Sequence, residues 1–175
     1  MAPGRPLHGA VGVERGPDDR NRPSAFSKAL GLAARRERSA RDLSRRLRQG
    51  GYAPDEAELA IGRLQELNFQ NDARFAGVLV RTRIAQGHGP RRIRAELRGH
   101  GLDDAAALAA IDAEGPDWGA LARSLYRRRF GARPAADAAE RSRRAAFLLR
   151  RGFDAATVRD LTHADDVDDS SDDFD

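Results

Sequence analysis

Residues 71–102 read NDARFAGVLVRTRIAQGHGPRRIRAELRGHGL, and this stretch decides the fold. Its first half carries an i, i+3, i+4, i+7 series that predicts a helix with one face toward a core: Phe75, Val78, Leu79 and Thr82. Pro90 comes directly after Gly87-His88-Gly89 and suits the first position of a second helix, because proline has no N–H to leave unpaired there. The stretch therefore predicts two helices joined by a tight turn.

The second helix of this stretch has a buried side and a charged side. Ile93 and Leu97 are spaced i and i+4, so we expect them to be buried together. Gly99 and Gly101 follow, and glycine supplies the backbone freedom that a helix end requires. Three arginines are predicted to share a neighbouring exposed face: Arg91, Arg94 and Arg98. The result is a helix pair with an arginine-lined outer surface.

The same pattern occurs three times along the chain. A glycine followed by an aromatic or apolar residue recurs at intervals of 50 and 51 residues: Gly51-Tyr52, Gly101-Leu102 and Gly152-Phe153. A short helical pattern precedes and follows each, and a longer leading helix is expected over 25–36, 72–86 and 117–130. These patterns predict an all-α fold, an elongated and curved array of three tandem three-helix repeats with nine helices.

Local signals mark several helix starts. Ser39 with Asp42 three residues later resembles a capping box. Prolines are placed to begin helices at Pro54 and Pro116 as well as at Pro90. Asp103 and Asp154 are placed to cap the last helices of the second and third repeats. We therefore expect repeats over 25–68, 69–114 and 115–163, with a disordered arm over 1–24 and a disordered acidic tail over 164–175.

The acidic tail holds seven aspartates and no basic residue. One interpretation is that it only keeps the chain solvated. The other is that it covers the basic surface of the repeats by mimicking phosphates. Deletion of residues 164–175 distinguishes the two, because loss of a shielding tail would tighten binding of DNA or of a partner at low salt.

Composition excludes several classes of function. There is no cysteine, so disulfides, thiolate metal sites and cysteine nucleophiles are excluded, and the four histidines lack metal-ligand spacing. No phosphate-binding loop or converging catalytic group is found, so we predict no catalytic residue, no metal and no cofactor. No apolar run approaches the roughly 20 residues of a membrane span. We expect a cytoplasmic protein, a monomer, that is not an enzyme and has no contact with membranes.

Positive charge is concentrated in the repeats. Residues 25–163 contain 27 of the 31 basic residues and 17 of the 27 acidic ones, which gives this region a net charge of +10. Such a surface attracts polyanions or acidic proteins. Arg41 and Arg48 in the first repeat match Arg91 and Arg98 in the second, so we expect an arginine stripe along one side. The candidate residues for binding a partner or nucleic acid are Arg41, Arg48, Arg81, Arg83, Arg91, Arg92, Arg94 and Arg98, with Gly87, Gly89 and Pro90 setting the turn.

The central stretch resembles the signature of the RecX family. The residues that carry the resemblance are Asp72, Phe75, Ala76, Val80-Arg81-x-Arg83, Gly87-x-Gly89-Pro90, Ile93, Leu97 and Gly101, and the resemblance extends over about 25–163. It implies a regulator that binds RecA and the RecA–single-stranded DNA filament and inhibits the recombinase and its ATP hydrolysis. The implied setting is homologous recombination, DNA repair and the SOS response. Direct contact of the basic face with DNA is left open.

A second interpretation belongs to another class of protein. Three-helix units with basic helices are also compatible with a helix-turn-helix DNA-binding protein or transcription factor acting on duplex DNA. The three repeats and the scarcity of Asn and Gln for reading bases argue against it. A helical adaptor for RNA is a third interpretation that fits the same residues.

Overall fold

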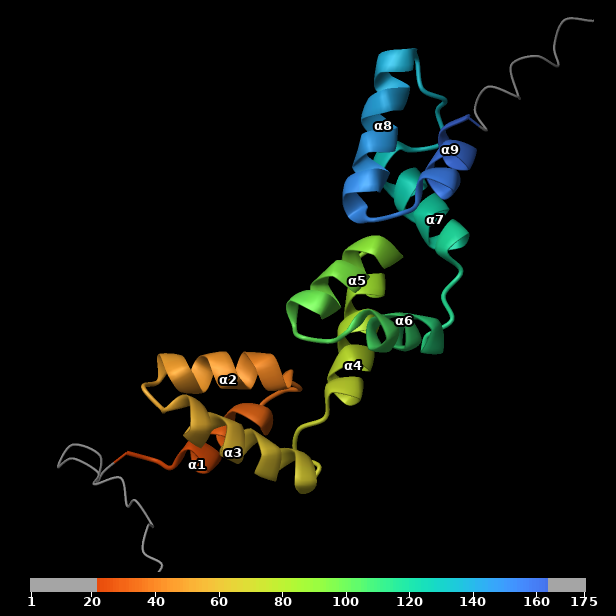
Figure 1. The fold of residues 1–175 in the computed structure, drawn as a ribbon. Helices are drawn as coiled ribbons and strands as arrows, with labels where there is room; N and C mark the ends of the chain where they lie inside the picture. Colours follow the sequence, from red (N-terminus) through yellow and green to blue (C-terminus); the bar gives the residue numbers. More distant parts are fainter. Residues whose placement is uncertain (1–21, 164–175) are drawn as a thin grey trace, which may run out of the picture.

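The computed structural model describes residues 22–163, which contain nine α-helices and no strand. The first repeat consists of α1 (Ala25–Ala33), α2 (Ala40–Gln49) and α3 (Pro54–Glu66). The second consists of α4 (Asp72–Ala85), α5 (Pro90–Gly99) and α6 (Asp104–Ala113), and the third of α7 (Trp118–Phe130), α8 (Ala138–Arg151) and α9 (Ala155–His163). Figure 1 shows the repeats following one another in an elongated, bent array, which confirms the predicted fold class. The expected arms lie outside the described residues, except for 22–24.

Each repeat has its own small core. Leu43, Leu47 and Leu64 are fully buried in the first, and Val80, Ile93 and Leu97 in the second. Leu148 and Phe153 are buried at the centre of the third. The half-buried Trp118 packs against the cores of both the second and the third repeat. Cores of this size depend on their neighbours for part of their burial, as in other repeat proteins.

Most of the predicted helix starts are confirmed. Pro54 and Pro90 occupy the beginnings of α3 and α5. The carboxylates of Asp103 and Asp154 accept backbone N–H groups at the starts of α6 and α9, at 2.8 and 2.9 Å. Pro116 is the exception, because α7 begins two residues later behind an N-cap at Asp117. The carboxylate of Asp117 accepts the Ala120 N–H at 2.9 Å. Proline has no side-chain acceptor for this hydrogen bond, so Asp117 and not Pro116 caps the helix.

The predicted buried face of α4 is wrong in part. Phe75 is buried as expected, but its buried partners are Ala76 and Val80. Val78 and Thr82 are exposed, and the Thr82 hydroxyl donates to the Val78 carbonyl within the same helix. The small Ala76 side chain suits a close approach of neighbouring helices, which turns the helix toward residues 76 and 80.

The second helices of neighbouring repeats (α2, α5 and α8) contact one another, with the C-terminal end of one helix against the N-terminal start of the helix in the preceding repeat. The turn after α5 lies against the start of α2, where a Cβ at Gly101 would be 3.2 Å from Arg41 Cβ. The turn after α8 lies against the start of α5, and Figure 1 shows α5 and α8 next to each other. There the Gly89 N–H donates to the Arg151 carbonyl at 2.8 Å and the Arg91 N–H donates to the Gly152 carbonyl at 3.1 Å. The carbonyl end of α8 thus satisfies free N–H groups at the start of α5.

Two glycines make the second of these joints possible. A Cβ at Gly89 would lie 2.5 Å from the Gly152 backbone, and a Cβ at Gly152 would lie 2.5 Å from Arg92 Cβ. Gly152 also has φ of +93°, which other residues rarely adopt. The two backbones can therefore touch only because both positions lack a side chain.

Candidate functional site

A groove of about 470 Å³ lies between α2 of the first repeat and α5 of the second. Its lining consists of Arg41, Asp42, Arg45 and Arg48 from α2, with Glu96, Gly99 and His100 from α5 and the turn that follows. Three of the four α2 residues are arginines at i, i+4 and i+7, a spacing that places them on one side of the helix. The end-to-start meeting of α2 and α5 therefore creates a basic groove between two repeats.

Asp42 organises the α2 wall of this groove. It is only 8% exposed, and its carboxylate accepts hydrogen bonds from Arg38 (2.7 Å), Arg46 (3.0 Å) and Arg45. Burial raises the pKa of Asp42, but the hydrogen bonds from the three arginines outweigh burial and lower the pKa to about 2. Asp42 is therefore ionised at neutral pH and holds Arg45 at the groove.

The opposite wall is held by an ion pair inside the second repeat. Arg83 of α4 donates to both carboxylate oxygens of Glu96, at 2.8 and 2.5 Å. These hydrogen bonds raise the pKa of Arg83 and lower the pKa of Glu96. His100 lies beside Phe75, with ring centroids 4.9 Å apart, and its Nδ1 is 3.4 Å from the Ser39 hydroxyl of the first repeat. The α5 wall is thus tied to α4 by the Arg83–Glu96 pair and to the buried Phe75 by His100.

The groove carries an excess of positive charge. Two carboxylates, Asp42 and Glu96, are surrounded by the guanidinium groups of Arg38, Arg41, Arg45, Arg46, Arg48 and Arg83. Arg41 and Arg48 are exposed and have no ion pair within residues 22–163. A site of this kind can bind an anionic chain or an acidic protein segment.

The other predicted binding arginines do not line this groove. Arg81 binds Glu114 (2.6 Å), and Arg94 binds Asp104 (2.7 Å), with Arg98 3.4 Å from the same Asp104 carboxylate. Arg83 binds Glu96 as described above. Arg92 lies at the joint with the third repeat, where its guanidinium is 3.4 Å from the Arg150 carbonyl, and Arg91 is exposed. The structure therefore separates the expected stripe into a groove and several local ion pairs, and the binding roles of these residues stay predictions.

The predicted turn residues form the joint between the second and third repeats. Gly89 and Pro90 begin α5 against the α8 turn, and a Cβ at Gly87 would lie 3.2 Å from Leu125. Between them, the Nδ1 atom of His88 is buried and has no hydrogen-bond partner among the described residues. Burial lowers the pKa of His88, and the charges of Arg92 and Arg151 lower it further.

One residue of the groove was not predicted from the sequence, and two side chains outside the groove are buried. His100 was not among the expected binding residues, whereas Arg45 belongs to the run of arginines that extends the expected stripe at its first-repeat end. Arg144 fits the pattern of an exposed arginine, yet it is 4% exposed and donates to the Tyr126 hydroxyl at 3.0 Å. Tyr52 is also buried, and its hydroxyl donates to the Pro23 carbonyl, so its ring is not exposed for base stacking.

Comparison with known protein families gives a consistent result over all three repeats. Models of the first, second and third three-helix domains of RecX match residues 25–64, 71–111 and 119–161. The chain belongs to the RecX family. The proteins named regulatory protein RecX in Xanthomonas axonopodis pv. citri (strain 306) and Stenotrophomonas maltophilia (strain R551-3) are each 46% identical to it over 138 residues. In both cases the match covers 79% of this chain and 85% of the relative.

Solved RecX structures share the fold. The crystal structure of RecX from Lactobacillus salivarius matches with a TM-score of 0.68 at 21% identity, over 81% of this chain and 94% of that one. A second crystal structure of a regulatory protein RecX also gives a TM-score of 0.68, at 23% identity, over 80% of this chain and 70% of that one.

Within residues 22–163, no group of three metal-ligating side chains occurs, and no helix combines the length and hydrophobicity that crossing a bilayer requires.

Proposed function

We propose that this RecX-family chain regulates a RecA recombinase in the cytoplasm. In this proposal it binds RecA and the RecA–single-stranded DNA filament as a monomer and inhibits strand exchange and ATP hydrolysis during recombination, repair and the SOS response. It acts by binding and performs no catalysis of its own. The groove between α2 and α5 is the surface that binds the filament.

The observation that carries this proposal is the position of the basic groove. It lies between two repeats of an elongated array, so an extended anionic partner can follow the molecule from one repeat to the next. Arg41 and Arg48 are exposed without an ion pair in residues 22–163, and both walls are braced by the Asp42 and Arg83–Glu96 hydrogen bonds. A braced site loses less side-chain freedom on binding than a mobile one. The relatives' name, regulatory protein RecX, is consistent with this activity.

The test is the steady-state ATP hydrolysis of the cognate RecA on single-stranded DNA, with the full chain titrated in. We expect inhibition well below one copy per RecA monomer, because a regulator of the filament affects many protomers at once. The variant Arg41→Glu/Arg48→Glu should need about tenfold more protein for half-inhibition, equivalent to ~1.4 kcal/mol. Glutamate keeps the Cβ and Cγ atoms of Arg41 that pack near Gly101, so the joint should persist.

The matched control is Arg123→Glu/Arg127→Glu, which makes the same change of charge on the exposed side of α7. It should inhibit like the unchanged chain. Equal losses in both double variants would show that net charge, and not the groove, is responsible. No inhibition at equimolar protein would contradict the proposed function itself.

A further inference from the structure

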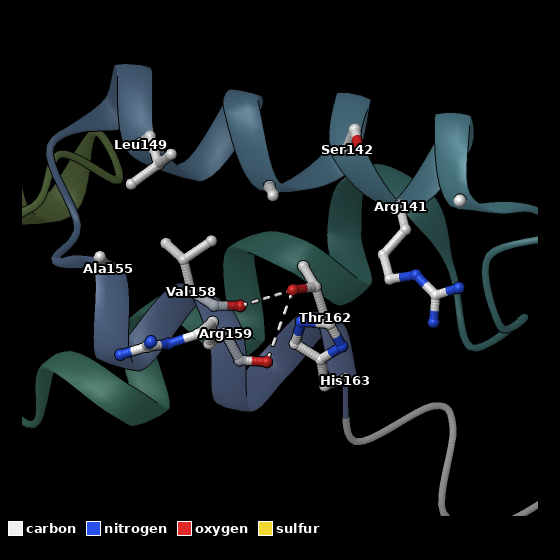
Figure 2. Close-up of a pocket in the computed structure, with 10 residues that line it drawn as sticks. Arg141, Ser142, Leu149, Ala155, Val158, Arg159, Thr162 and His163 are labelled. Atoms are coloured by element: carbon white, nitrogen blue, oxygen red, sulfur yellow. Dashed lines mark hydrogen bonds between the residues drawn. The ribbon is translucent and has the colours of Figure 1, made fainter.

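The third repeat has an open apolar groove of about 340 Å³ between α8 and α9. Figure 2 shows Leu149 of α8 and Val158 of α9 facing each other across one end, with Arg141 and His163 at the other. Leu149 is 46% exposed, so the mouth of the groove presents a large apolar side chain to solvent. The Thr162 hydroxyl donates to the Val158 carbonyl at 2.9 Å, so the polar group on the groove floor is satisfied within its helix.

The same place in the second repeat is covered by an ion pair. The turns at Gly101 and Gly152 align the repeats with a shift of 51 residues, so that Arg94, Arg98 and Asp104 correspond to Ala145, Leu149 and Ala155. In the second repeat, Arg94 and Arg98 reach across to Asp104 and join α5 to α6 at the surface. In the third repeat, the corresponding alanines cannot bridge α8 and α9. Replacement of the ion pair by small and apolar residues leaves the groove open.

The rim of this groove is positively charged. Arg141 and Arg159 line it together with His163, and none of the ten lining residues is acidic. An apolar floor with a basic rim fits a segment that combines acidic residues with isolated apolar side chains. The groove is physically separate from the basic groove between α2 and α5, whose lining shares no residue with it.

We propose that the chain's own residues 164–175 occupy the α8–α9 groove. Their sequence, ADDVDDSSDDFD, offers seven carboxylates for the rim and two larger apolar side chains, Val167 and Phe174, for the floor. The segment begins directly after His163, which itself lines the groove. Because it is covalently attached, its effective concentration at the groove is in the millimolar range, so weak contacts suffice to hold it.

The segment is long enough to do this. Twelve residues extend up to about 40 Å. The nine residues of α9 span only about 13 Å at 1.5 Å per residue, so a chain that turns back after His163 can run the length of the groove. This docking places the acidic segment at the third repeat and not over the arginines of the α2–α5 groove. The inference does not depend on the proposed function.

The test uses paramagnetic broadening in the full chain. The natural sequence has no cysteine, so Ser170→Cys provides a single attachment point for a nitroxide label. In ¹⁵N-labelled protein, we expect the amide signals around Ala145, Leu149 and Val158 to lose intensity when the label is oxidised and to regain it when the label is reduced. A mixture of ¹⁵N-labelled unmodified chain with unlabelled nitroxide-bearing chain should show no loss, because the contact is within one molecule.

Leu149→Glu is the decisive variant, because it removes the large apolar side chain at the mouth of the groove and places there a negative charge that repels the acidic segment. It should restore the groove signals, whereas Leu108→Glu on α6, where the leucine is 42% exposed, should leave the broadening unchanged. Val167→Ser/Phe174→Ser should restore the signals without altering the folded repeats. Broadening around Arg41 and Arg48, broadening in the mixed sample, broadening nowhere, or broadening that survives both variants would each overturn the proposal.

Discussion

At the scale of single residues, Asp42 is the charge on which the α2 wall depends. Its folded-state pKa of about 2 lies below the ordinary value of 3.8, so its contribution to stability is complete above about pH 4 and is lost as the pH falls toward 2. The difference corresponds to roughly 2 kcal/mol at about 1.4 kcal/mol per pKa unit. The three arginines that Asp42 holds would otherwise repel one another.

Asp42→Asn should lower the free energy of unfolding at neutral pH by roughly 2 kcal/mol, because the amide keeps the shape of the side chain and loses its charge. Urea unfolding of the two proteins gives the difference. It should shrink as the pH is lowered from about 4 toward 2, where the native carboxylate becomes protonated. A difference that stays constant over this range would mean that the arginine cluster does not stabilise the ionised form.

His88 gives a pH dependence of the same sign in a higher pH range. Its pKa in the folded protein lies below 6.5, because the ring is buried and faces Arg92, Arg151 and Arg83, with Glu96 acting in the other direction. The unfolded chain therefore takes up a proton near pH 6.5 that the folded protein takes up only at lower pH. The stability associated with neutral His88 is present above pH 6.5 and is lost as the pH falls below it.

His88→Gln should remove this part of the pH dependence. We expect the midpoint of thermal unfolding of the natural chain to fall more steeply than that of the variant between about pH 7 and pH 5.5. His100→Gln serves as a comparison, because it removes a histidine from the other joint. Identical pH profiles for the natural chain and the His88 variant would show that burial at the turn does not affect protonation.

The sequence predicts which residues are charged but not which charges face a partner. Arg83 and Glu96 are 13 residues apart and meet only because α4 and α5 pack together. Arg144 reads as part of a basic run, yet the fold turns it inward to the Tyr126 hydroxyl and the Arg133 carbonyl. Such pairings depend on the angle between helices, which periodicity does not encode. The exposure of Arg41 and Arg48 on one side of α2 could be predicted, because they follow a simple spacing on one helix.

At the scale of helices, the repeats are joined through their second helices, α2, α5 and α8, each of which contacts the next at its end. The beginnings of α3, α5, α6 and α9 could be predicted, because proline and aspartate signals act within one turn of helix. The rotation of α4 could not, because Phe75, Val78 and Leu79 give as good a helical pattern as Phe75, Ala76 and Val80. Only packing against α5 and α6 selects between the two faces.

Gly89→Ala tests the joint between the second and third repeats. Gly89 has φ of −85°, which alanine adopts readily, so the substitution leaves the local backbone unstrained. Its Cβ would nevertheless lie 2.5 Å from the Gly152 backbone, so we expect the third repeat to separate from α5. Small-angle X-ray scattering should show a larger radius of gyration, and the third repeat should unfold at lower denaturant concentration.

Gly31→Ala is the control for that change. Gly31 lies within α1 and a Cβ there meets nothing within 4 Å, so alanine should stabilise the helix by ~0.5–1 kcal/mol without altering the scattering. An unchanged radius of gyration in Gly89→Ala would show that the two repeats do not depend on backbone contact at this joint.

At the scale of the whole molecule, the net charge of the repeats is distributed unevenly. Many arginines form ion pairs within the repeats, such as Arg81–Glu114 and Arg94–Asp104. The α2–α5 groove keeps exposed guanidinium groups between two repeats. The array and its repeat boundaries follow from the spacing of Gly51, Gly101 and Gly152, whereas the groove follows from how the repeats meet, which the spacing does not contain.

In the proposed function, this groove binds the RecA filament. The most direct measurement is equilibrium binding of the fluorescently labelled full chain to RecA–single-stranded DNA filaments assembled with a non-hydrolysable ATP analogue. We predict that Arg41→Glu/Arg48→Glu raises the Kd by about tenfold or more, while Arg123→Glu/Arg127→Glu leaves it unchanged. Filament binding by Arg41→Glu/Arg48→Glu with the Kd of the natural chain would contradict this role of the groove.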